Sequence, residues 1–305
     1  MLPFYKVLLK EEAMQKKSIP VNNQTSNKAM MLKKETPFYD AYFDKNSYEM
    51  FKFDVGAVCT RNAILSKVPI STGSALEIGI GISSLLEKLQ QFTCTGIDIS
   101  QKTIETTEHL FKAHQLQGSF IQTDAASLPF TDDSFDVIVT SHVFEHIEDD
   151  GKAFKEVARV LKPGGTFIMF VPGSLDGKAP QEEWEKCGHY RNYNKAEILR
   201  LQKASSDTLL LQSIEYKHKI HNLIWNKCKH IVRYINYPIK KWLLRDNKDV
   251  ESRKTYQRFF LPALSVSLDY LDKLTHHKEA YLLGTKFNVL AVFKKIITDA
   301  KSKEI

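Results

Sequence analysis

Residues Glu77-Ile78-Gly79-Ile80-Gly81-Ile82-Ser83-Ser84 give the first indication of the fold class of this chain. They continue a short apolar run, Ala75–Ile78, that is typical of a buried strand, and a helical pattern follows near Leu85–Gln91. Glycines at a turn from a strand to a helix let a ligand approach the backbone, and the helix N-terminus offers N–H donors to it. A dinucleotide-binding Gly-x-Gly-x-x-Gly motif would place its third glycine at Ser84, so the spacing does not favour a dinucleotide.

The residues around this stretch repeat the alternation of short apolar runs with helical patterns. Such an alternation is typical of β-α-β units in a parallel sheet. Lys162-Pro163-Gly164-Gly165 predicts the end of a helix and a turn into the next strand. The other expected strands are Cys94–Ile97, Ser119–Ile121, Phe135–Thr140, Phe167–Val171, Leu209–Tyr216 and Phe287–Phe293, and the other expected helices are Lys102–Gln115, Lys152–Leu161 and Lys195–Ala204.

Polar residues follow the predicted strands where each strand ends. Asp98 ends the strand Cys94–Ile97 and lies seventeen residues after Gly81. An acidic side chain at this place can accept hydrogen bonds from the two hydroxyls of a ribose, or it can cap the next helix, for which Ser100 is also a candidate. The carboxyl ends of parallel strands share one edge of the sheet, so we expect a ligand site there.

Six blocks occur in a fixed order along the chain. They are Leu76-Glu77-Ile78-Gly79-x-Gly81, Gly96-Ile97-Asp98-Ile99-Ser100, Asp124-Ala125 with Leu128-Pro129-Phe130, Ser134-Phe135-Asp136, Phe144-Glu145-His146, and Leu161-Lys162-Pro163-Gly164-Gly165. Through these blocks, roughly residues 39–203 and 287–293 resemble the class I S-adenosylmethionine-dependent methyltransferases, in particular the ubiquinone and menaquinone biosynthesis branch. The resemblance implies an α/β fold: a Rossmann-like, mostly parallel sheet of seven strands with an antiparallel last strand and helices on both faces.

The resemblance also implies a cofactor, S-adenosylmethionine, and the residues that bind it. Glu77, Gly79 and Gly81 would lie around its methionine part, and Asp98 would hold the ribose hydroxyls. The adenine would be framed by Ile99, Asp124 and Ala125. Ser83 stands where the family often has a third glycine, a mild change that we do not expect to abolish binding.

Histidines near the end of the fourth strand are the candidates for catalysis. Methyl transfer to oxygen needs in-line positioning and removal of the acceptor's proton, and His142 is our first candidate for the base, with His189 second. His189 belongs to His189-Tyr190-Arg191-Asn192-Tyr193, which is either a packed loop or part of a substrate pocket.

The same histidines raise the question of a metal. His142, Glu145 and His146 have the spacing of one helical face, with His189 as a candidate fourth ligand. Some relatives that methylate catechols or RNA ends bind a divalent metal through Glu-x-x-Glu-His. His142 replaces the first Glu here, so we expect no metal site.

Charge is concentrated in one segment of this 305-residue chain of net charge +7. Residues 217–258 hold twelve Lys and Arg residues against three acidic ones, together with aromatic residues. Three interpretations remain: a solvated helical face, a contact with a membrane surface, or a site for an anionic acceptor. We expect a mobile tail at 1–35, a methyltransferase domain at 36–216 plus 286–295, and a basic helical insertion at 217–285 that serves as a substrate lid or membrane contact.

The expected function is S-adenosylmethionine-dependent methylation, at oxygen, of a small, lipid-like or glycan acceptor. The alternatives are a nicotinamide-dependent oxidoreductase, which Ser84 and the later blocks disfavour, and a non-catalytic binding protein on the same fold. An RNA methyltransferase is a further alternative, but no RNA-binding module accompanies the domain, so we do not expect nucleic acid as a partner. Four scattered cysteines and the lack of an export signal lead us to expect a cytoplasmic protein, peripheral at most to a membrane.

Overall fold

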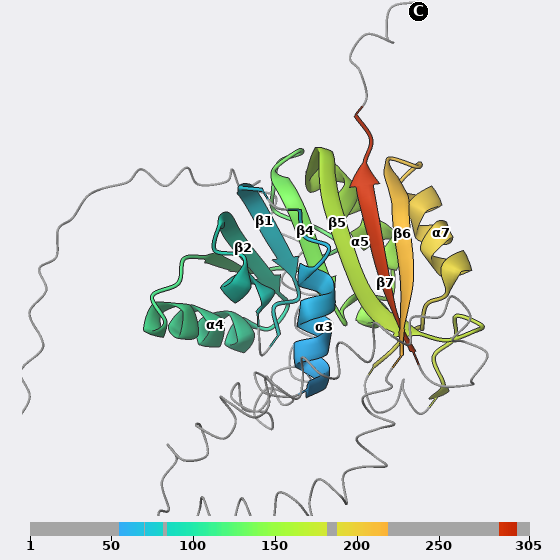
Figure 1. The fold of residues 1–305 in the computed structure, drawn as a ribbon, viewed down its shortest axis with the longest axis horizontal. Coiled ribbons are helices and arrows are strands. Elements are labelled where there is room, and N and C mark those ends of the chain that lie inside the picture. Colours follow the sequence, from blue (N-terminus) through green and yellow to red (C-terminus); the bar gives the residue numbers. More distant parts are fainter. Residues whose placement is uncertain (1–54, 70, 82–83, 182–187, 219–286, 298–305) are drawn as a thin grey trace, which may run out of the picture.

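The computed structural model describes residues 55–69, 71–81, 84–181, 188–218 and 287–297 (Figure 1). Every predicted strand is present, most of them extended by a few residues. The elements in chain order are α3 (Val55–Leu65), β1 (Gly73–Ile78), the 3₁₀ helix η1 (Leu85–Lys88), β2 (Phe92–Asp98), α4 (Gln101–Ala113), β3 (Ser119–Gln122), β4 (Phe135–Ser141), the 3₁₀ helix η2 (Phe144–His146), α5 (Asp150–Val160), β5 (Leu161–Gly173), α7 (Lys195–Ala204), β6 (Leu209–His218) and β7 (Phe287–Lys295).

The described strands form one seven-stranded sheet in the order β3-β2-β1-β4-β5-β7-β6. β1 to β5 pair in parallel, and β7 pairs antiparallel with both β5 and β6. The expected Rossmann-like sheet with an antiparallel last strand is therefore confirmed. The strand order reverses at β1, which lies between β2 and β4, and such a switch point is where open α/β sheets bind ligands.

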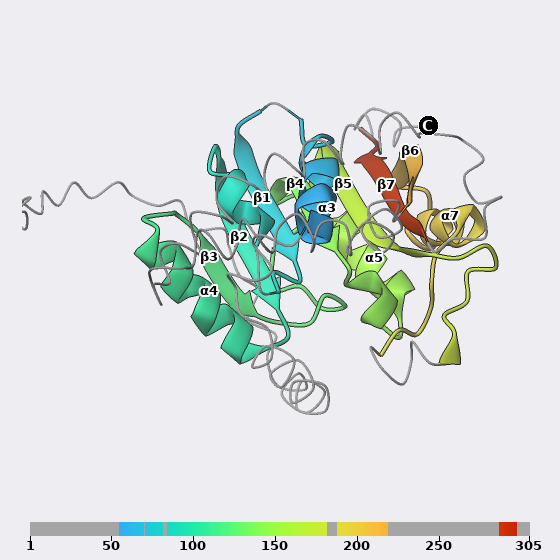
Figure 2. The same cartoon turned by 60° about the horizontal axis from the view of Figure 1, so that its bottom comes forward.

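Helices cover both faces of the sheet, because alternate side chains of each buried strand point to opposite sides. In one core cluster, Phe154 of α5 and Ile198 of α7 lie with Ile138 of β4. In the other, Ile64 of α3 and Phe111 of α4 lie with the β4 valines. Figure 1 shows α3 in front of the sheet and α5 behind it, and the turned view in Figure 2 separates these layers.

Two local features differ from the sequence-based expectation. The helix expected near Leu85–Gln91 is only η1, since the chain must bury Leu85, Leu86 and Leu89 and still begin β2 at Phe92. The stretch Lys162–Gly165 does not precede a separate strand. It is an irregularity within β5, because Leu161 already pairs with Phe135 and regular pairing with β4 resumes at Thr166.

Parts of the predicted domain organisation lie outside the described residues. The expected tail at 1–35 and nearly all of the insertion at 217–285 are among them. Lys217 and His218 are described, and both belong to β6, which runs slightly beyond its predicted end. Among the helices that the structure describes, none has the length and apolar composition needed to cross a bilayer.

Candidate functional site

The glycine turn after β1 is held against the neighbouring strands. The backbone N–H groups of Gly79 and Ile80 both donate to the carbonyl of Ile97, at N···O distances of 2.8 and 3.2 Å. Gly79 has a φ of +73°, and a Cβ placed there would lie 2.2 Å from Val143 Cγ2. Only glycine combines this conformation with this close approach, so the turn packs directly against the loop that follows β4.

Asp98 lies at the carboxyl end of β2, facing the same turn. Its Oδ2 accepts from Gly81 N–H at 3.1 Å and its Oδ1 accepts from Ser100 N–H at 2.9 Å. The capping role falls to Ser100, whose hydroxyl accepts from Thr103 N–H at the start of α4. A Cβ placed at Gly81 would meet no heavy atom of the described residues within 4 Å, so a ligand can approach the backbone there.

The end of β3 is tied to the end of β2. Thr123 N–H donates to the carbonyl of Asp98 at 3.0 Å, and the Gln122 side chain donates to the carbonyl of Ile99 at 2.9 Å. Asp124 is half-buried and accepts from Ala126 N–H. Ala125 is mostly packed into the core. The residues expected around the adenine thus lie along one edge with Asp98.

Glu77 is buried rather than exposed at that edge. Its carboxylate accepts from the Ser84 hydroxyl at 2.5 Å and from the N–H groups of Leu85 and Leu86 at 3.1 and 3.4 Å. Burial raises the pKa of Glu77 to about 8, although these three hydrogen bonds act in the opposite direction. The described contacts of Glu77 therefore fix the start of η1, and with it the path of the chain after the glycine turn.

His142 follows β4 in an unusual backbone conformation. Its φ is +55°, a left-handed conformation that costs free energy for any residue other than glycine. Its backbone N–H donates to the carbonyl of Phe170, and its ring packs edge-on against the Phe170 ring. The Nδ1 atom lies 3.2 Å from Oε1 of the buried Glu145.

Glu145, His146 and His189 form a second cluster beside His142. The two imidazole rings meet at a centroid distance of 4.7 Å, and one candidate ligand atom from each of the three residues lies within 4.8 Å of the others. Burial opposes ionisation of Glu145, but the hydrogen bond to His142 and the nearby imidazoles hold its pKa below the usual value. Burial also lowers the pKa of His146.

The loop that carries His189 is fixed by a buried carboxylate that the sequence did not single out. Asp150 accepts from the Tyr193 hydroxyl at 2.9 Å and from Arg200 Nη2 at 2.7 Å, and its Oδ2 lies 3.0 Å from Arg191 Nη1. Arg191 and Tyr193 are therefore packing residues of the loop. No local sequence pattern predicts this contact, because Asp150 and Tyr193 are 43 residues apart in the chain.

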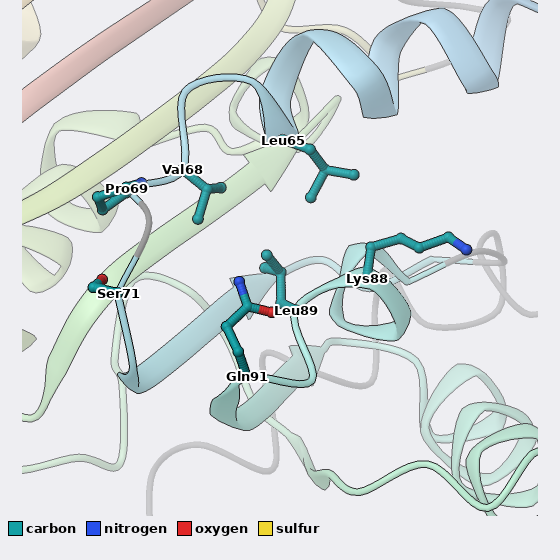
Figure 3. Close-up of a pocket in the computed structure, with 7 residues that line it drawn as sticks. All are labelled: Leu65, Val68, Pro69, Ser71, Lys88, Leu89 and Gln91. Carbon is teal, nitrogen blue, oxygen red and sulfur yellow. The ribbon is translucent and has the colours of Figure 1, made fainter.

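A hollow of about 350 Å³ lies elsewhere, beside the amino end of β1 (Figure 3). Ligands of open α/β sheets bind at the carboxyl ends of the strands, so we assign this hollow no role in the chemistry. It is lined by Leu65, Val68, Pro69, Ser71, Lys88, Leu89 and Gln91.

Comparison with known proteins identifies the central part of the chain. Residues 76–169 match the family model described as "Methyltransferase domain". The chain is 29% identical over 144 residues to a demethylmenaquinone methyltransferase of Roseiflexus castenholzii. The matched stretch covers 46% of this chain and 57% of that protein. It is 31% identical over 119 residues to ajmaline N-methyltransferase of Rauvolfia serpentina, covering 35% and 41%. The chain thus spans about half the length of these curated relatives.

A solved structure agrees on the fold. It is phosphoethanolamine N-methyltransferase 2 of Haemonchus contortus in complex with S-adenosyl-L-methionine, with a TM-score of 0.52 and 20% identity, covering 78% of this chain and 52% of that one. At this identity the likeness concerns the fold alone. Together with the family match, it confirms the resemblance of the central part to class I methyltransferases.

Proposed function

We propose that this chain, whose residues 76–169 match the methyltransferase-domain family model, uses S-adenosylmethionine to transfer a methyl group to an oxygen atom of a small or lipid-like acceptor. One observation carries the proposal. The Asp98 carboxylate is fixed by two backbone amides beside a glycine turn that leaves room for a ligand, at the switch point of the sheet.

The residues at this edge fit S-adenosylmethionine. A carboxylate offers about four acceptor positions, so Asp98 can bind Gly81 and Ser100 and still accept from the two ribose hydroxyls. Gly79 and Gly81 would lie along the methionine part. Glu77 would support the turn through its hydrogen bonds to Ser84, Leu85 and Leu86. Ile99, Asp124 and Ala125 would border the adenine. When bound, the cofactor supplies an electrophilic methyl group on its sulfonium.

The acceptor side supplies the base. His142 follows β4 next to Val143, which approaches the glycine turn, so an acceptor held here would lie near the transferred methyl group. With Nδ1–H donating to Glu145 Oε1, the Nε2 atom of His142 would take the proton of the acceptor hydroxyl. The tautomer is assigned from this partner. His189 is the second candidate for the base.

The acceptor class is proposed from the relatives and from the sequence. One relative is named for demethylmenaquinone and another for methylation at nitrogen of ajmaline. The basic segment 217–258 favours an acceptor at or near a membrane surface. If so, the protein should sediment with vesicles of acidic lipids at low salt and be released as salt rises, whereas neutral vesicles should bind far less. If the protein does not sediment with acidic vesicles at low salt, the membrane-surface interpretation is rejected and a soluble acceptor is favoured.

Cofactor binding is tested by calorimetry on Asp98→Ala. Hydrogen bonds to a charged group contribute about 1.5–3 kcal/mol, so the variant should bind S-adenosylmethionine at least tenfold more weakly while remaining folded. Glu108→Ala, an exposed carboxylate of α4, is the matched control. Unchanged affinity in Asp98→Ala would reject the ribose assignment.

The atom that is methylated is tested with labelled cofactor. The protein should transfer a labelled methyl group to phenolic or quinol hydroxyls and not to the corresponding amines. Transfer to amines alone would move the reaction to nitrogen, and transfer to neither, with cofactor bound, would support a binding protein.

A further inference from the structure

We propose that Glu145, His146 and His189 form a binding site for a divalent transition-metal ion, of which Zn²⁺ is the representative. The sequence led us to expect no metal, because His142 replaces the first carboxylate of the known ligand pattern. The geometry points the other way. The third candidate ligand is His189, from a loop that is distant in sequence, so the site does not need residue 142 as a ligand.

The spacing of the three residues suits a metal ion with little adjustment. Their candidate ligand atoms lie within 4.8 Å of one another. Around a tetrahedral zinc with bonds of about 2.0–2.2 Å, ligand atoms are roughly 3.3 Å apart. Small side-chain rotations are sufficient to close this difference.

The burial of Glu145 is the second observation. Its side chain is 0% exposed, and Oε2 has no hydrogen-bond partner among the described residues, whereas Oε1 is held by His142. A buried carboxylate oxygen without a partner is costly, and a cation removes that cost. A carboxylate with one oxygen oriented by a neighbouring group is also the usual arrangement of a metal ligand.

The scaffold of the cluster is already formed in the protein. Tyr190 N–H donates to the carbonyl of Glu145 at 2.8 Å, which holds His189 beside the loop after β4. Arg191 donates to the carbonyls of Ile147 and Glu148 at 2.7 and 2.6 Å. Two segments more than 40 residues apart are thus locked together, so a metal would not have to order them.

The donor set selects the class of metal. Two imidazoles and one carboxylate favour Zn²⁺, Co²⁺ or Ni²⁺, while Mg²⁺ and Ca²⁺ prefer oxygen ligands alone. Three protein ligands would leave a further coordination position for a water or an acceptor oxygen, as in catalytic zinc sites. A hydroxyl bound there would be more acidic, and His142 is adjacent to take its proton. This consequence rests on the proposed function, whereas the metal site itself does not.

The test measures metal binding by the full chain without cofactor. Protein stripped with a chelator is titrated with Zn²⁺, and bound metal is counted by elemental analysis. His146→Ala, His189→Ala and Glu145→Gln should each bind one equivalent less, or bind it on the order of 100-fold more weakly. His109→Ala, an exposed histidine of α4, should match the wild type. Since ten histidines and four cysteines are present, the difference between variants is the measurement.

Two further readouts keep the result independent of folding and of activity. Co²⁺ should give a visible absorption band that the three variants lose, and circular dichroism and S-adenosylmethionine binding should show that they remain folded. His189→Gln replaces His189→Ala if the latter does not fold.

The proposal is overturned if folded variants bind as much Zn²⁺ as the wild type, or if Mg²⁺ competes equally with Zn²⁺. If Zn²⁺ binding is lost in the variants but no methyl transfer is found in the wild type, the metal site stands and the proposed reaction fails.

Discussion

The proposed site has a cofactor side, around the glycine turn and Asp98, and an acceptor side, around His142 and Glu145, and the two sides are built in different ways. The cofactor side uses backbone N–H groups and short side chains within residues 79–100, such as the Gly81 and Ser100 amides on Asp98. The acceptor side uses side chains from separate segments: Tyr193 and Arg200 contact the Asp150 carboxylate, and His142 contacts the Glu145 carboxylate. On the cofactor side we therefore expect the strongest effects at the two glycines and at Asp98, whose carboxylate the backbone holds. A site made of buried ionic side chains depends on each of them.

The largest expected effect follows from removing the carboxylate on which the acceptor side depends. Asp150→Ala should lower the free energy of unfolding by about 3–5 kcal/mol, because it removes the acceptor of the buried Tyr193 hydroxyl and the carboxylate that pairs with Arg191 and Arg200. Chemical denaturation measures the loss. Asp149→Asn, which can still cap α5, should change stability by less than about 0.5 kcal/mol. Equal effects of the two substitutions would contradict the central role of Asp150.

The next effect separates chemistry from cofactor binding. If His142 is the base, as proposed, His142→Asn should lower the rate of methyl transfer by about 100-fold. Asparagine tolerates the positive φ and can still donate to Glu145, so the fold and the cofactor affinity should be unchanged. Single-turnover kinetics and calorimetry check both statements, and His109→Asn serves as the control. A rate within twofold of the wild type would shift the role of base to His189.

The two glycines of the turn test the contact between the two sides. Gly79→Ala should lower the free energy of unfolding by about 2 kcal/mol, because the new Cβ would clash with Val143 and because alanine is strained at the positive φ of this position. Gly81→Ala meets no described atom, so it should cost only about 1 kcal/mol from its φ of +52°. Thermal unfolding measures both. The added substitution Val143→Ala should restore part of the loss in Gly79→Ala but none in Gly81→Ala, and failure of this rescue would disprove the contact.

The smallest effect is the pH dependence that Glu77 gives to the cofactor side. Its pKa is raised to about 8 in the folded chain, so folding favours the protonated form. Its contribution to stability is complete below the unfolded pKa of about 4.5, and is lost as the pH rises towards the folded value.

Glu77→Gln mimics the protonated carboxyl, since its amide can donate to the Ser84 hydroxyl, which already accepts from Leu86 N–H. Between pH 5 and 7.5 we expect the wild type to lose at least about 1 kcal/mol more than this variant does. Denaturation at several pH values decides it, with the exposed Glu108→Gln as control. Parallel pH profiles of the wild type and Glu77→Gln would refute the effect of burial.

Most of the fold could be predicted because its signals are local. Apolar runs, helical periodicity and the glycine turn are written in neighbouring residues, and each predicted strand is found in the sheet. Asp98 could be placed for the same reason, since it follows a strand at a characteristic distance from the turn. The length of η1 and the irregularity within β5 could not be predicted from the sequence, because they depend on how the short connections pack against the core.

The proposed acceptor side depends on contacts between distant segments, which the sequence alone does not reveal. The sequence already grouped Glu145, His146 and His189 as candidate ligands, but only the packing of the loop after β5 shows that their candidate ligand atoms lie within 4.8 Å of one another. Asp150 became important through Tyr193, Arg191 and Arg200, none of which is its neighbour in sequence. Local residue patterns predict the secondary structure of a segment, because they reflect interactions between residues that are close in sequence. Contacts between distant segments arise only when the sheet buries its faces and fixes which loops meet at its edge.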